Sequence, residues 1–520
     1  MNVSVEYYIL IVTLPEMKGR FYIMASNDKH IKLRIIAVNS FLCLLFIATA
    51  ARVIYLQAFK NKELSKIAIS QHERNMETLG KRGSIYDTLN KKLAVSINAY
   101  SIGADIKNIK DPFSTAEKLA NILNLNSKTL YKSFISKRQF VWIKRQVNPY
   151  KTAKIKAMKL PGICFSSDFC RYYPGKTLAA QVLGFAGIDG KGLEGLEFSF
   201  NSSLKGEEEK IKMIRDAIGQ KFPAEQITPP DHAGNNIILT LDRTIQYITE
   251  KALAKAVQKY KAKSGIAVVM DPDTGALLAI AHYPLFNPNT YRSYDRERWR
   301  NRAITDPFEP GSTMKIFLAA TALESGLCLP NTTFFCENGS YRIGKDIVND
   351  VHPHDWLTLE EIIKFSSNIG AVKIAEVTGK KRLYNMLKAF GFGNKTNIEC
   401  PGETAGLLAP SNKWAKIDTG AISFGQGLSV SAIQLAVATS AIANGGKLMK
   451  PYIVKSIARP DGKKINTFSP HVVNTVISAK TADAIKNMMN SVVAEGGTGS
   501  NAAIKNYERI LRWYSGSSCF

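Results

Sequence analysis

The sequence predicts an α+β fold that follows a single N-terminal membrane helix. Residues 35–56 form an apolar run that is long enough to cross a bilayer. Residues 237–242 are apolar and β-rich, and they lead into a helical pattern over 246–261. Residues 265–281 contain two apolar strands joined by an Asp-Pro-Asp-Thr-Gly turn. The sequence therefore predicts an antiparallel hairpin followed by helices.

Composition allows two or three ordinary globular domains. The 520 residues are 45% hydrophobic and 22% charged, and the net charge of +26 is spread along the chain. Because the sequence shows no aromatic-rich basic patch and no phosphate-binding glycine loop, we expect no nucleic-acid partner. A diffuse positive charge fits an anionic membrane surface or a cell-wall polymer, and a simple bias toward lysine is the alternative.

The apolar run at 35–56 is expected to be a transmembrane anchor rather than a buried core helix. Arg34 and Arg52 flank its most apolar part, and the run shows no amphipathic period. No small-residue cleavage site follows, so the chain should stay tethered. Residues 1–34 would form a cytosolic segment, and Met24 offers an alternative start.

The seven cysteines form no Cys-x-x-Cys pair, so we expect no metal site and no cofactor. Cys164 with Cys170, and Cys328 with Cys336, are possible disulfides in an exported domain. Buried free thiols are the simpler expectation.

Ser312 and Lys315 are the strongest candidates for chemistry. They lie three residues apart after a helix-opening Pro310-Gly311, so the lysine amine should reach the serine hydroxyl as its base. The same spacing occurs at Ser26–Lys29 and Ser202–Lys205, where no neighbouring motif supports a site.

A second polar motif is Ser366-Ser367-Asn368. It is either a polar loop between two helices or a source of hydroxyl and amide groups for proton relay and hydrogen bonding. Taken with Ser312 and Lys315, it resembles the layout of the serine penicillin-recognising enzymes.

Further motifs resemble class B penicillin-binding proteins of the division-specific branch, from about residue 34 to 507. Arg82 and the glutamates Glu194 and Glu197 are expected to hold a pedestal together through ion pairs. The motifs that carry this resemblance are residues 81–87, 92–94, 171–174, 184–187 and 192–197. The resemblance implies an elongated pedestal domain at 57–230 and a transpeptidase domain at 231–507, with an antiparallel sheet covered by helices.

The family's third motif, Lys-Thr-Gly, is missing from the sequence. Lys480-Thr481-Ala482 reads as a helix start, and Gly497-Thr498-Gly499 reads as the loop that precedes the expected strand. Tyr514-Ser515-Gly516-Ser517 lacks the cation. Residues 508–520 are unlike the family, so we expect a transpeptidase domain that is truncated or frameshifted at its C-terminus.

The resemblance implies a peptidoglycan D,D-transpeptidase that acts in septal wall synthesis. Ser312 would attack a stem peptide ending in D-Ala-D-Ala, Lys315 would take its proton, Ser366 would relay a proton to the leaving group, and Asn368 would bind the peptide. β-Lactams would acylate Ser312. The soluble domains would lie on the periplasmic side of a bacterial inner membrane, beside a cell-wall glycosyltransferase and other division proteins.

Two alternatives stay open. The absent third motif favours a non-catalytic division scaffold, because losing one oxyanion-hole donor costs about 3–4 kcal/mol of transition-state stabilisation. A β-lactamase or β-lactam sensor fits poorly, because neither needs the pedestal.

Overall fold

The computed structural model describes seven stretches of the chain: residues 29–58, 73–78, 80–136, 138–206, 209–215, 221–223 and 233–503. Contacts divide the chain into two units. The first contains residues 1–76 and 212–224, and the second contains residues 77–211 and 225–520. The predicted tail at 508–520 and the start at Met24 lie outside the described residues.

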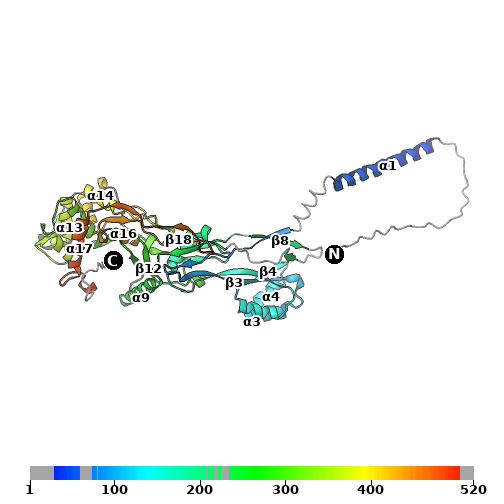
Figure 1. Cartoon of the computed structure of the whole chain (residues 1–520), viewed down its shortest axis with the longest axis horizontal. Helices are drawn as coiled ribbons and strands as arrows, with labels where there is room; N and C mark the ends of the chain where they lie inside the picture. Colours follow the sequence, from blue (N-terminus) through cyan, green and yellow to red (C-terminus); the bar gives the residue numbers. More distant parts are fainter. Residues whose placement is uncertain are drawn as a thin grey trace. The chain divides into compact units, whose positions relative to one another are not determined.

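Helix α1 (Lys29–Ala58) is the long helix coloured dark blue in Figure 1. Its segment Leu33–Leu56 is the one stretch of the described residues that is long and apolar enough to cross a membrane. The large apolar side chains of this segment are exposed. An apolar helix without a protein core around it is compatible with a membrane anchor. Strands β1 (Glu73–Thr78), β8 (Glu209–Arg215) and β9 (Lys221–Pro223) form a three-stranded sheet.

The N-terminal half of the second unit is built on the long strand β3 (Lys92–Asp105), which pairs antiparallel with two later strands. Three amphipathic helices pack on this sheet and form a core around Leu119, Phe134 and Ile155. Figure 1 shows two of these helices, α3 and α4, beside β3 and β4. The elements of this lobe are η1 (Ile106–Asn108), α3 (Pro112–Leu123), α4 (Ser127–Phe134), β4 (Phe140–Val147), α5 (Pro149–Ala157) and β5 (Ile163–Tyr172).

A buried cluster of charges holds the next segment in place. Glu197 is fully buried and accepts hydrogen bonds from Arg82 at 2.5 Å and Arg171 at 2.6 Å. The predicted ion pair is therefore present at Glu197, whereas Glu194 is the N-cap residue of α7. The short elements here are α6 (Ala180–Leu183), β6 (Phe185–Ala186), β7 (Gly192–Glu194), α7 (Gly195–Ser199) and α8 (Asn201–Leu204).

The predicted strand, helix and hairpin are present in the second half of this unit. The first strand occupies Asn236–Leu239 (β10), and the helix that follows occupies Arg243–Lys259 (α9). The hairpin consists of β11 (Gly265–Met270) and β12 (Leu277–Tyr283), paired antiparallel. Strand β10 continues the sheet of β3 through β2 (Ile85–Tyr86), in the order β19, β18, β10, β2, β3, β4. One core cluster consequently contains residues of both halves, from Ile85 to Val492.

Helices and short strands complete the unit. In Figure 1, α13, α14, α16 and α17 lie together. The predicted helix start at Lys480 is confirmed, because α17 begins at Ala479. The remaining elements are η2 (Pro288–Ser293), η3 (Arg296–Arg298), α10 (Arg302–Thr305), η4 (Gly311–Met314), α11 (Lys315–Glu324), β13 (Thr333–Phe335), η5 (Glu337–Gly339), β14 (Ser340–Ile343), β15 (Asp346–Asn349), β16 (Trp356–Thr358), α12 (Leu359–Phe365), α13 (Asn368–Thr378), α14 (Lys380–Ala389), η6 (Ser411–Lys413), α15 (Lys416–Ser423), α16 (Ala432–Ala443), β17 (Lys447–Met449), β18 (Val454–Ala458), β19 (Lys464–Thr467), β20 (Val472–Thr475), α17 (Ala479–Val493) and η7 (Ser500–Ala502).

Candidate active site

Ser312 lies in a turn of 3-10 helix rather than in an α-helix. This turn, η4, covers Gly311–Met314, and the α-helix α11 begins at Lys315. Residues three apart in a 3-10 helix lie almost directly above one another, so Ser312 and Lys315 still share a face. The Gly311 N–H donates to the Gly425 carbonyl at 3.1 Å, which ties the serine turn to the segment after α15. A Cβ atom at Gly425 would come within 2.0 Å of the Gly311 oxygen, so this contact requires glycine.

Lys315 is buried, with 1% of its surface exposed. Its Nζ donates to the Ser366 carbonyl at 2.5 Å, to Ser366 Oγ at 3.0 Å and to Asn368 Oδ1 at 2.9 Å. Burial lowers the pKa of the Lys315 ammonium to about 7, and the negative charge of Asp350 opposes that shift. A large fraction of the amine is therefore neutral near pH 7 and can accept a proton.

The Ser366–Asn368 motif is a tight turn between two helices. Ser366 ends α12 in the left-handed conformation, with φ of 58°, and Ser367 begins α13 as its N-cap. This backbone turns the Ser366 carbonyl and hydroxyl toward Lys315, while the Ser367 hydroxyl accepts from the Gly370 N–H at 2.9 Å. The turn is therefore the polar connection between two helices that the sequence allowed, and its hydroxyl and amide groups contact Lys315.

The three partners of Lys315 differ in what they can do. The Ser366 carbonyl and Asn368 Oδ1 can only accept hydrogen bonds, whereas the Ser366 hydroxyl can accept or donate. When the amine is neutral it has two N–H donors and one lone pair. Two donors fit the two obligatory acceptors, so Ser366 is the partner that can reverse its bond and exchange a proton with Lys315.

Sequence reasoning missed Asp350, which follows β15. Its carboxylate accepts from the Ser367 hydroxyl at 2.5 Å and from the backbone N–H of Ile369 at 3.0 Å. No local pattern could have found it, because the contact depends on how the chain between β15 and α13 folds back. The loop at 497–499 lies near the same turn, since Thr498 Oγ1 donates to the Lys364 carbonyl at 3.1 Å.

The structure also bears on metals and thiols. Within the described residues, no group of three or more His, Cys, Asp or Glu side chains could hold a metal ion. Cys170, Cys328, Cys336 and Cys400 carry free thiols. The disulfide between Cys328 and Cys336 that the sequence allowed is therefore absent.

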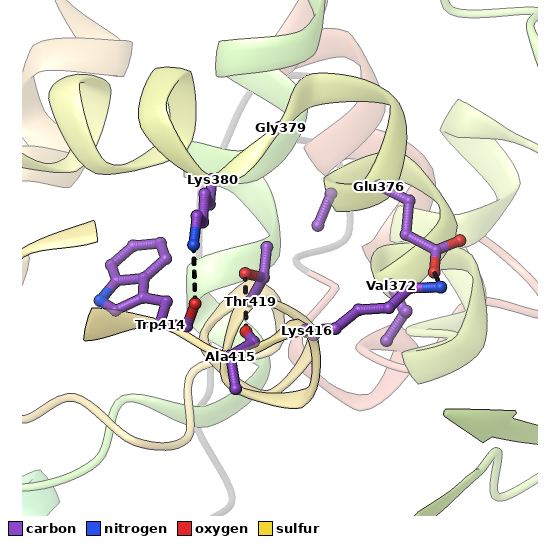
Figure 2. Close-up of a pocket in the computed structure, with 10 residues that line it drawn as sticks. Val372, Glu376, Gly379, Lys380, Trp414, Ala415, Lys416 and Thr419 are labelled. Carbon is purple, nitrogen blue, oxygen red and sulfur yellow. Dashed lines mark hydrogen bonds and ion pairs between the residues drawn. The ribbon is translucent and has the colours of Figure 1, made fainter. Parts of the chain in front are cut away.

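A separate cavity of about 380 Å³ lies between α13 and the start of α15. Figure 2 shows Lys380 directed at the Trp414 carbonyl and Lys416 beside Glu376 across this space. None of the four predicted site residues lines it. The cavity is therefore distinct from the cluster around Lys315.

Comparison with known proteins identifies the family to which this chain belongs. The model of the penicillin-binding protein transpeptidase domain matches residues 265–510, and that of the penicillin-binding protein dimerisation domain matches residues 77–239. Stage V sporulation protein D of Bacillus subtilis is 35% identical over 493 residues, covering 93% of this chain and 76% of its own. The chain belongs to the penicillin-binding protein family of peptidoglycan D,D-transpeptidases.

Other relatives of this penicillin-binding protein agree with that assignment. Peptidoglycan D,D-transpeptidase FtsI of Escherichia coli is 34% identical over 470 residues, covering 89% of this chain and 77% of its own. The crystal structure of penicillin-binding protein 3 from Mycobacterium tuberculosis, complexed with aztreonam, aligns with a TM-score of 0.62 and 28% identity. That alignment covers 82% of this chain and 80% of the other. The predicted class B fold, with a transpeptidase domain after a dimerisation domain, is confirmed.

Proposed function

We propose that Ser312, Lys315, Ser366 and Asn368 form the acyl-transfer site of this penicillin-binding protein. The observation that carries the proposal is the buried Lys315, whose pKa is lowered to about 7 and whose amine contacts both Ser366 and Asn368. A base that is partly neutral near physiological pH is what a serine nucleophile needs, since the free hydroxyl is a weak nucleophile.

The reaction proceeds in two balanced steps on a stem peptide that ends in D-Ala-D-Ala. Ser312 Oγ bonds to the carbonyl carbon of the penultimate D-Ala while Lys315 takes the hydroxyl proton. The bond to the terminal D-Ala nitrogen then breaks, and Ser366 passes a proton from Lys315 to that nitrogen. Asn368 holds the peptide by hydrogen bonds. The amine of a second stem peptide attacks the carbonyl carbon of the acyl-serine and forms the cross-link. The bond to Ser312 Oγ breaks, and the amine proton passes through Lys315 to Ser312 Oγ. β-Lactams enter the same first step and leave Ser312 acylated.

The cellular setting is also part of the proposal. Residues 35–56 anchor the protein in a bacterial inner membrane, residues 1–34 stay in the cytosol, and the soluble part lies on the periplasmic side. We assign the pedestal to 57–230 and the transpeptidase domain to 231–507. FtsI and stage V sporulation protein D among the relatives support a role in septal wall synthesis. A cell-wall glycosyltransferase and other division proteins are the expected partners.

Labelling with a fluorescent penicillin tests the proposal. Membranes that carry the full chain should show a covalent fluorescent band that disappears in Ser312→Ala. A Ser312-independent band would contradict the assignment of the nucleophile.

The rival function is a non-catalytic division scaffold, in which the membrane helix and the dimerisation domain bind a cell-wall glycosyltransferase. The same experiment separates the two functions. A folded, membrane-bound chain that takes up no penicillin at saturating concentration would support the scaffold, whereas a Ser312-dependent band would exclude it.

A further inference from the structure

The Asp350 carboxylate binds the Ser366–Asn368 turn, although the two segments lie apart in the sequence. One carboxylate oxygen accepts from the Ser367 hydroxyl at 2.5 Å, and the other accepts from the backbone N–H groups of Asn368 at 2.5 Å and Ile369 at 3.0 Å. Ser367 is the N-cap of α13, so these are the first N–H groups of an 11-residue helix. A carboxylate at this position is stabilised by otherwise unpaired donors and by the helix dipole.

The residue before Asp350 completes the arrangement. The Asn349 carbonyl accepts from Asn368 Nδ2 at 3.2 Å, while Asn368 Oδ1 accepts from Lys315 at 2.9 Å. Asp350 accepts from the backbone N–H of Asn368, and the side-chain Nδ2 and Oδ1 of Asn368 each have a hydrogen-bond partner. The amide orientation of Asn368 toward Lys315 is therefore fixed from the end of β15.

Asp350 also carries the negative charge that acts on Lys315. Burial lowers the pKa of the Lys315 ammonium, and the Asp350 carboxylate is the charge that raises it. The pKa of the Cys336 thiol is raised chiefly by burial, and the charges of Asp350, Asp355 before β16 and Lys373 on α13 also act on it. Cys336 Sγ lies 3.7 Å from Ser367 Oγ, so the thiol contacts the same turn.

We propose that Asp350 is a positioning residue of the acyl-transfer site: its carboxylate orients Ser367 and Asn368 and supplies the counter-charge for Lys315. This inference rests on the proposed function, since it concerns the same site. Asp350 itself acts through other residues and contacts no reacting atom in the proposed mechanism. Its effect should appear both in the rate of acylation and in the pH at which Lys315 loses its proton.

The test compares Asp350→Asn with Asp355→Asn, a matched control that removes a nearby negative charge without the helix contacts. Acylation of the full chain in detergent micelles by a fluorescent penicillin is measured from about pH 5 to about pH 9. Asp350→Asn should lower the high-pH rate by about tenfold or more and move the acidic midpoint to lower pH, because the charge opposing deprotonation is gone. Asp355→Asn should stay within about twofold of the parent, as expected for an exposed charge.

Two results would overturn the inference. In the first, Asp350→Asn matches Asp355→Asn in both rate and midpoint; in the second, it lowers the rate without moving the midpoint, as a purely structural residue would. If Asp350→Asn fails to fold, Ser367→Ala removes only the hydroxyl bond. That variant should lower the high-pH rate with an unchanged midpoint, and a rate equal to the parent would contradict the positioning role.

A second readout separates this inference from the proposed function. The ¹³Cε resonance of Lys315, assigned by its loss in Lys315→Arg, is titrated without penicillin in the parent and in Asp350→Asn. A lower midpoint in Asp350→Asn supports the counter-charge even if no variant is acylated, in which case the proposed function alone fails. Identical midpoints in a parent that is acylated contradict the inference alone.

Discussion

The second unit buries two clusters of charge, and they treat that charge in opposite ways. Burial would raise the pKa of Glu197, but Arg171 and Arg82 outweigh burial and hold that pKa below its usual range. Lys315 is equally buried, and its three hydrogen-bond partners are neutral oxygens. Its pKa therefore falls to about 7. The comparison shows that a buried charge paired with opposite charges stays ionised and serves structure, whereas a buried amine with only neutral partners leaves a proton available for chemistry.

The largest expected effect is on the rate of acylation, and it comes from replacing Lys315. Lys315→Met should lower the rate of acylation by about a thousandfold or more, because the serine loses its base. The fold should persist, since methionine fills the same space without a buried amine. The rate is measured with fluorescent penicillin, and the intact fold by circular dichroism. A folded Lys315→Met protein with the parent rate would remove Lys315 from the mechanism.

Removing one arginine from the ion-paired cluster around Glu197 should instead lower the stability of the fold. Arg171→Met leaves Glu197 buried with one arginine, which should cost about 3–5 kcal/mol of unfolding free energy. Denaturant unfolding measures the loss. The control is Arg300→Met, whose side chain is 45% exposed and whose partner Glu297 is 67% exposed, and it should cost about 1 kcal/mol or less. Equal losses in the two variants would show that burial does not distinguish these ion pairs.

The two clusters should also differ in how pH affects stability. Between about pH 7 and the usual lysine value, Lys315 is neutral in the folded chain and protonated in the unfolded one. The unfolded state binds the extra proton, so this residue makes stability rise with pH in that window, by about 1.4 kcal/mol per unit. Glu197, with its lowered pKa, contributes no slope there, because its stabilisation is lost only as pH falls through its folded pKa. The difference between parent and Lys315→Met unfolding free energies at several pH values measures the slope. A constant difference would contradict the lowered pKa.

The smallest effect is expected at an exposed ion pair. Lys416 contacts Glu376 at 3.2 Å beside the cavity in Figure 2, and 71% of the lysine side chain is exposed. Lys416→Gln should change stability by about 0.5 kcal/mol or less and leave acylation unchanged. A large loss of acylation in this variant would show that the cavity is coupled to the site.

Local patterns in the sequence predicted local structure well. The sequence predicts two strands within residues 265–281, and the structure places them at Gly265–Met270 and Leu277–Tyr283, because the apolar runs and the turn signal between them are contiguous. The Ser312–Lys315 spacing placed two side chains on one face, but it did not reveal that the turn is a 3-10 helix tied to Gly425.

What the sequence could not predict depends on distant segments. The lowered pKa of Lys315 requires the burial that only the packed helices provide. Asp350 contacts Ser367 because the segment between β15 and α13 folds back, and the residues next to each of them show no pattern that predicts the contact. The long apolar helix at Leu33–Leu56, which is compatible with a membrane anchor, by contrast needs no tertiary contact, and the apolar run alone predicted it.

The pH dependence of acylation tests the central claim, that Lys315 is a base poised near neutrality, most directly. The second-order rate constant for a β-lactam should be constant at high pH and fall about tenfold per unit below a midpoint near the Lys315 pKa of about 7. A Ser312-dependent rate that stays flat well below pH 7, or whose midpoint lies near the ordinary lysine value, would contradict it.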